Sequence, residues 1–169
     1  MTDQRGVDSR TSDDLAGKYL TFVLDGEQYG LEILKVREIN GTMTITSVPK
    51  TPPHIKGVIN LRGKVIPVID LRLKFDLQGL DWTEETCIIV VDVAGLETGL
   101  IVDRVSEVQE IQAEDIEPPP SFGAQVETNF ILGMSKSADR VTILLNIDTV
   151  LVGENLDQIV SETDKEAIA

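Results

Sequence analysis

Histidine and cysteine are almost absent from this chain, which has one of each among its 169 residues, His54 and Cys87. A zinc site needs several such ligands, and a Ser–His–Asp triad would depend on this single imidazole. His54 stands in a Pro-Pro-His-Ile turn without an obvious orienting partner, and Cys87 opens an apolar run that favours an inert, buried thiol. The residues therefore argue against an enzyme and against a metal site.

Clusters of basic residues and long apolar runs are missing as well. The chain has 29 acidic and 15 basic residues, a net charge of −14. Nucleic acids and anionic membrane surfaces attract clustered Lys and Arg, so this composition disfavours both as partners. There is no N-terminal signal pattern and no apolar run long enough to span a bilayer. We therefore expect a cytoplasmic protein without direct membrane contact.

Aromatic residues make up only 4% of the chain, so a core must be built from Val, Ile and Leu, which favours strands. The chain also repeats itself. Gly26 and Gly30 recur 69 residues later as Gly95 and Gly99. After a longer second loop the offset becomes 76, and Gly57 matches Gly133. Asp25–Gly26 and Ala94–Gly95 mark equivalent hairpin turns, and each copy contains about five short strands.

Five strands are too few for an open sheet with protected edges, whereas a closed barrel has none. The sequence therefore predicts a mainly β protein of two similar five-stranded barrels packed side by side, with a short C-terminal helix. We expect a polar, disordered lead-in at residues 1–17 and a body at 18–152, with subdomains near 18–80 and 81–152. Residues 153–169 hold the helix and tail, with Asn155 as cap and an apolar face of Leu156, Ile159 and Val160.

Residues 55–72, IKGVINLRGKVIPVIDLR, read as two buried strands around a tight Asn-Leu-Arg-Gly turn with Arg62 at its tip. This hairpin is explained more easily by a contact surface than by a reaction. The segment GVINLRGKVIPVIDLR, together with YGLEILKVREI at residues 29–39, resembles the CheW family of bacterial chemotaxis coupling proteins. The resemblance extends over roughly residues 18–152. It implies SH3-like barrels, no cofactor, and a non-enzymatic adaptor that joins the cytoplasmic tips of chemoreceptors to the histidine kinase CheA.

The resemblance also implies roles for particular positions. It assigns to the receptor a groove between the barrels, and the matching residues here are Ile33, Val36, Glu38, Arg62, Val105 and Val108. It also implies that the kinase carries a homologous two-barrel domain, so that the two proteins can pair barrel with barrel and form mixed rings at receptor arrays. Our candidates for this kinase contact are Glu27, Lys56 and Phe122.

Other interpretations stay open at this level. The aliphatic residues assigned to the groove can be ordinary core residues. Arg62 can be a solvated turn residue, and Phe122 can be a loop residue that packs on its own barrel. The cleft between barrels could bind a nucleotide, although the chain offers only four Phe, two Tyr and one Trp for stacking. A free-standing version of the kinase's regulatory domain, without receptor contact, is a further alternative.

Overall fold

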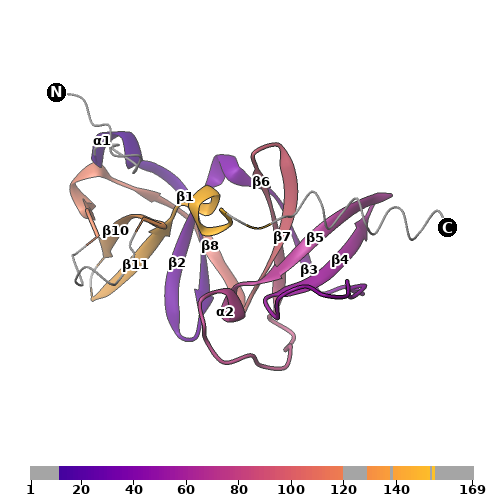
Figure 1. Cartoon of the computed structure of the whole chain (residues 1–169). Helices are drawn as coiled ribbons and strands as arrows, with labels where there is room; N and C mark the ends of the chain where they lie inside the picture. The colour runs from indigo at the N-terminus through magenta and orange to yellow at the C-terminus, as the bar shows by residue number, and fades with distance from the viewer. Residues whose placement is uncertain (1–11, 120–128, 138, 153, 155–169) are drawn as a thin grey trace.

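The computed structural model describes residues 12–119, 129–137, 139–152 and 154. Within these residues strands predominate and the helices are short, so the expected mainly β fold is confirmed (Figure 1). The strands are β1 (Gly17–Leu24), β2 (Glu27–Glu32), β3 (Val36–Gly41), β4 (Ile55–Leu61), β5 (Lys64–Asp70), β6 (Cys87–Val93), β7 (Leu96–Val102), β8 (Arg104–Ile111), β9 (Ile116–Glu117), β10 (Ile131–Ser137) and β11 (Arg140–Leu145). The helices are α1 (Ser12–Leu15), α2 (Leu71–Lys74) and α3 (Ile147–Val150), with 3-10 turns η1 (Ile33–Lys35) and η2 (Ala113–Asp115).

The strands form two mixed sheets, with the orders β8-β1-β2-β11-β10-β9 and β3-β6-β7-β5-β4. Neighbouring strands are antiparallel except at β2–β11 and β5–β7, which are parallel. The sequence offsets of 69 and 76 convert one order into the other, and the registers agree. Leu144 lies opposite Gly30, as Val68 lies opposite Gly99. The internal repeat is therefore a structural duplication.

The two copies exchange their first hairpins. Hairpin β1–β2 of the first copy lies in the sheet built from β8 to β11, and hairpin β6–β7 of the second copy lies between β3 and β5. The predicted division at residue 80 is therefore wrong. One barrel combines β1 and β2 with β8 to β11, and the other contains β3 to β7. Equal hydrophobic patterns in the two copies allow either pairing, so the sequence could not reveal the exchange.

Each sheet is curved, and a single segment of the chain links its two edges. In the six-stranded sheet the edge strands β8 and β9 are connected through η2. In the other sheet the chain beyond β3 reaches Thr46, which exchanges backbone hydrogen bonds of 2.8 and 2.9 Å with Val58 of β4. Closure of this kind protects the edge strands and gives the two barrel-like subdomains that the sequence predicted.

The core has three parts, and the exchanged hairpins contact all of them. A central cluster takes side chains from both sheets, including Phe22, Ile89 and Leu100. The other faces of the same hairpins pack inside the barrels, with Ile88 in one interior and Tyr19 in the other. Because successive side chains of a strand point to opposite faces, these hairpins bury both faces. The barrels therefore share a core.

The structure differs from the sequence expectation at the N-terminal lead-in. Residues 12–15 form α1, and Leu15 is buried among Tyr19, Ile111 and Leu144 inside a barrel. A single leucine among polar neighbours carried too little pattern to predict this helix. At the other end, α3 begins after Asn146, whose side-chain oxygen accepts the Thr149 N–H. The helix predicted after Asn155 lies outside the described residues.

Candidate partner-binding surface

The β4–β5 hairpin turns through two residues, Arg62 and Gly63, both with positive φ (54° and 86°). This is the backbone of a tight hairpin turn that matches strand twist. The Asn60 side-chain oxygen accepts the Gly63 N–H at 2.8 Å and fixes the turn. An arginine in the left-handed region is unusual, and conformations of this kind cost about 1–3 kcal/mol. The turn presents the Arg62 side chain at the tip of the hairpin, as the sequence predicted.

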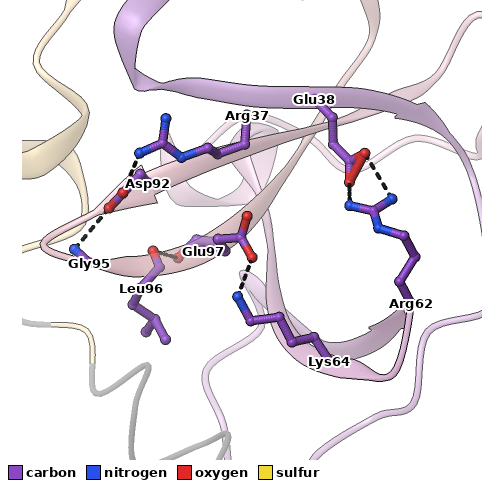
Figure 2. Close-up of polar contacts among 9 residues, drawn as sticks. Arg37, Glu38, Arg62, Lys64, Asp92, Gly95, Leu96 and Glu97 are labelled. Carbon is purple, nitrogen blue, oxygen red and sulfur yellow. Dashed lines mark hydrogen bonds and ion pairs between the residues drawn. The ribbon is translucent and has the colours of Figure 1, made fainter.

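The Arg62 guanidinium meets the Glu38 carboxylate of β3 through two bonds, from Nη1 to Oε1 at 3.1 Å and from Nη2 to Oε2 at 2.6 Å (Figure 2). The Arg62 side chain is 70% exposed and that of Glu38 is 25% exposed. The hydrogen bond from Arg62 holds the pKa of Glu38 below its usual value, and Glu38 raises the pKa of Arg62. Two predicted site residues, 24 positions apart in sequence, therefore form one forked pair.

Two further ion pairs lie on the same face of this sheet (Figure 2). Lys64 Nζ contacts Glu97 Oε1 at 2.7 Å, and Arg37 Nη2 contacts Asp92 Oδ2 at 2.7 Å. Hydrogen bonds from Arg37 and from the backbone N–H of Gly95 keep the pKa of Asp92 low. Cations and carboxylates are therefore paired between β3, the β4–β5 tip and the β6–β7 hairpin. Such a surface can select partners by charge complementarity.

The predicted groove aliphatics divide into two kinds. Ile33, Val36 and Val105 are half-buried against the central cluster, so they support the core as well as any contact. Val108 on β8 is 52% exposed. The sequence reasoning missed Ile39, which occupies the equivalent position on β3 and is 44% exposed. The offset of 69 relates the two positions and could have identified Ile39.

The sequence reasoning also missed Leu34, which is 86% exposed in η1. The candidates for kinase contact are not brought together. Glu27 is exposed at the start of β2, whereas Lys56 is exposed on β4 in the other sheet. Phe122 lies outside the described residues.

The reactive side chains are held in structural contacts. Nε2 of His54 is 2.8 Å from Glu154 Oε2, which also accepts a bond from Lys74. Cys87 is half-buried rather than buried, and its thiol donates to the Glu85 carbonyl at 3.2 Å. Within the described ranges, no three His, Cys, Asp or Glu side chains gather in a way that could hold a metal ion. None of the helices in that part of the chain has the length and apolar character that a bilayer crossing requires.

Four of the aromatic side chains that could form a nucleotide platform are packed against one another. Phe22, Tyr29, Phe75 and Phe130 form a row with ring centroids 5.7–5.9 Å apart. Tyr29, Phe75 and Phe130 line a hollow of about 610 Å³. Burial is the main cause that raises the pKa of Tyr29. The row packs the junction of the two barrels around α2.

Comparisons with known proteins agree with one another. The family model of the CheW-like domain matches residues 18–154. The chemotaxis protein CheW of Klebsiella aerogenes is 39% identical over 150 residues, which cover 89% of this chain and 90% of that protein. The CheW protein of Bacillus subtilis is 35% identical over 139 residues, covering 82% and 88%.

A solved structure gives the same result at the level of the fold. The crystal structure of the scaffolding protein TtCheW from Thermoanaerobacter tengcongensis has a TM-score of 0.75 and 39% identity to this chain. The match covers 82% of this chain and 94% of that one. The duplicated barrels, the hairpin tip and these relatives lead to one conclusion: the chain belongs to the CheW-like family of chemotaxis proteins.

Proposed function

We propose that the protein is a non-enzymatic adaptor that couples the cytoplasmic tips of chemoreceptors to the histidine kinase CheA. The proposal rests on family membership and on one observation in the structure. The Glu38–Arg62 pair stands at an exposed hairpin tip, next to a strand with exposed and half-buried aliphatic residues. An aliphatic floor with a charged rim is what a helix needs to dock in a fixed register.

In this proposal Arg62 contacts the receptor while it remains paired with Glu38. A guanidinium has five N–H donors in a fixed plane, and the fork with Glu38 uses two of them. The remaining donors of a side chain that is 70% exposed are available to a carboxylate or to carbonyl groups at a helix end. Glu38 therefore holds the guanidinium in place before the receptor arrives. Ile33, Val36, Val105 and Val108 supply apolar contact on either side.

The kinase contact is a separate part of the proposal. Glu27, Lys56 and Phe122 would face the homologous two-barrel domain of CheA, and such head-to-tail contacts can close into mixed rings. We expect Phe122→Ser to weaken binding to that domain about tenfold or more, because an aromatic anchor often dominates an interface. Receptor binding by the same variant should stay at its wild-type level. Unchanged kinase affinity would remove Phe122 from this face.

The cellular setting follows from the same role. An adaptor between receptor tips and a soluble kinase works in the cytoplasm and gathers at receptor arrays on the inner face of the membrane. The nucleotide-binding alternative gains no support from the family, and four of the chain's aromatic side chains are packed against one another.

Co-sedimentation tests the adaptor role. Receptor signalling fragments, the kinase and this protein are mixed in all combinations and pelleted with the receptor assembly. The proposal predicts that kinase pellets efficiently with receptor only when this protein is present. If the amount of kinase recovered does not depend on this protein, then this protein does not couple the kinase to the receptor. Recovery of this protein with kinase but never with receptor would favour the free-standing regulatory domain.

A further inference from the structure

The duplication builds a similar surface hollow at each barrel. One hollow of about 500 Å³ is lined by residues 14–19, by 32–35 in and before η1, and by Asn146 and Asp148. The other, of about 330 Å³, is lined by residues 83, 85–86 and 101–104 and by Asp70 and Arg72, among others. The offset of 69 relates the first two sets, and the offset of 76 relates Asp70 to Asn146 and Arg72 to Asp148. The fold therefore makes the same site twice.

At the first hollow, this chain supplies its own covering segment. Helix α1 carries Asp13 and Asp14, followed by Leu15, which is buried inside the barrel. Lys18 and Lys35 line the same hollow. The covering segment therefore consists of two acidic residues followed by a leucine that enters the barrel, and two lysines lie beside it. A short segment with one buried leucine is thus enough to cover this end of the fold.

At the second hollow, the equivalent segment leaves apolar side chains in solvent. The position that matches Leu15 is occupied by Glu84, which is exposed. Leu80 and Trp82 line the hollow and are 58% and 40% exposed. They lie on the loop between α2 and β6, which extends beyond the ends of the strands (Figure 1). Among the residues that the structure describes, no helix like α1 therefore covers this apolar rim.

The second hollow is lined by one carboxylate more than the first, which has three carboxylates and two lysines. Its lining includes four carboxylates and two arginines. Arg72 is satisfied by Asp103 through bonds of 2.7 and 2.8 Å, and Asp70 accepts the N–H groups that begin α2. Within the described part of the chain, Asp81 and Glu85 take no ion-pair partner. The rim is therefore apolar and acidic.

We propose that the hollow bounded by Leu80 and Trp82 docks a short segment of a partner protein, in which a leucine-like side chain is flanked by lysine or arginine. The leucine would enter the hollow as Leu15 enters the other barrel. The flanking cations would meet the exposed carboxylates of Asp81, Glu84 and Glu85. This contact is separate from the face around Arg62, so it stands or fails independently of the adaptor role.

Trp82 is the only tryptophan of the chain and reports directly on the hollow. The intact protein is titrated with the peptide acetyl-Lys-Lys-Leu-Lys-Lys-amide while Trp82 emission is recorded. Two control peptides replace the leucine by serine or the lysines by glutamates. We expect a saturable blue shift with the first peptide only. Leu80→Ser should weaken the apparent affinity about tenfold, since a leucine contact is lost. Val141→Ser, at a residue 47% exposed on β11, should not change it.

Each other outcome overturns the proposal. Equal responses to the leucine and serine peptides would mean general attraction of cations to a chain with a charge of −14. A blue shift on concentrating the protein alone would identify a second copy as the occupant. If Trp82 emission does not change with any peptide, the hollow does not bind a basic segment that carries a leucine.

Discussion

Arg62 and Arg72 each meet a carboxylate through two bonds, but in opposite surroundings. Arg62 lies on a solvent-exposed turn, whereas Arg72 is only 8% exposed. Nε and Nη2 of Arg72 donate to Asp103, and Nη1 donates to the Gln78 carbonyl at 2.8 Å. Asp103 also accepts the Asp25 N–H at 2.8 Å. Arg72 thus connects α2 of one barrel to the β1–β2 turn of the other.

Arg72→Ala should lower the free energy of unfolding by about 1.5–3 kcal/mol, the usual effect of losing a charged hydrogen bond. Asp103 would stay partly desolvated without its cation, which is why the loss should be clear. Urea unfolding at neutral pH measures it. Lys136→Ala is the matched control, because the Lys136–Glu117 pair is more than half exposed on both sides and should contribute nothing measurable. Equal effects of the two variants would contradict a connecting role for Arg72.

The same pair predicts how stability depends on pH. Burial raises the pKa of Asp103, but the hydrogen bond and the charge of Arg72, together with the hydrogen bond from the Asp25 N–H, outweigh it, so the net pKa is lowered. For Glu154 burial also raises the pKa, and Lys74 and His54 outweigh it. Lowered folded-state values mean stabilisation that is complete above the unfolded pKa, about 4, and lost as pH falls through the folded pKa.

Unfolding free energies measured from pH 7 down to pH 2 should therefore fall in acid. Asp103→Asn should be less stable at neutral pH and should lose less on acidification, because the titrating group is gone. If the variant and the wild type lose stability in parallel below pH 4, Asp103 does not contribute to the acid response.

Sequence reasoning placed Arg62 at a turn tip because Asn-Leu-Arg-Gly is a local signal. Glu38 was named as a site residue, but its pairing with Arg62 depends on how β3 and the β4–β5 tip meet in space. Arg72 was not singled out, because an arginine after a buried strand and an aspartate resembles any helix start. Its role depends on Asp103, which is distant in sequence.

Gly57 on β4 and Gly133 on β10 allow the backbone to approach closely where each barrel closes. A Cβ on Gly57, where φ is +137°, would lie 1.9 Å from the Thr46 carbonyl oxygen, at the bridge that closes the sheet. A Cβ on Gly133, the equivalent residue, would lie 2.9 Å from Cγ2 of Ile116 and 3.0 Å from the Glu117 oxygen. A Cβ on Gly41 would meet no atom within 4 Å.

Alanine at these three sites should therefore destabilise in the order Gly57, Gly133, Gly41. We expect Gly57→Ala to lower the free energy of unfolding by about 2 kcal/mol or more, because backbone must move and the positive φ is strained. Gly133→Ala should have a smaller effect, and Gly41→Ala should be close to wild type. Thermal and urea unfolding rank the variants. A Gly57→Ala protein as stable as Gly41→Ala would mean that the Thr46–Val58 closure is unimportant.

The hairpins and their turns were predictable because their signals are local. Asp25–Gly26 and Ala94–Gly95 both turn with positive φ, as the Gly-containing pairs indicated. Strands such as β5, with apolar residues on both faces, could be recognised as buried. The sequence could not show which hairpin lies beside β5, because the two hairpins have similar hydrophobic patterns. The choice depends on packing between residues that are distant in sequence.

At the scale of the whole molecule, the exchanged hairpins make the two halves of the chain interdependent. Fragments 1–80 and 81–169 each lack the hairpin that completes their own sheet. We expect each fragment alone to lack cooperative thermal unfolding, and an equimolar mixture to recover the circular dichroism of the intact protein. Two fragments that fold independently would contradict the exchange and restore a division near residue 80.

The adaptor role also belongs to the whole molecule, because it requires two partners at once. Arg62 and Lys64 provide a close comparison within one hairpin. Both side chains are 70% exposed, and each is paired with a glutamate of a neighbouring strand. They differ in what they offer a partner, a planar fork or a single ammonium group.

The most direct test measures kinase recovered with receptor fragments in the presence of wild-type protein, Arg62→Lys or Lys64→Ala, each shown to be folded. We expect Arg62→Lys to keep the charge yet reduce receptor binding and kinase recovery about tenfold, because an ammonium group cannot replace the fork. Lys64→Ala should recover kinase as the wild type does. Full recovery with Arg62→Lys, and equally with Arg62→Ala, would contradict the assignment of this tip to the receptor.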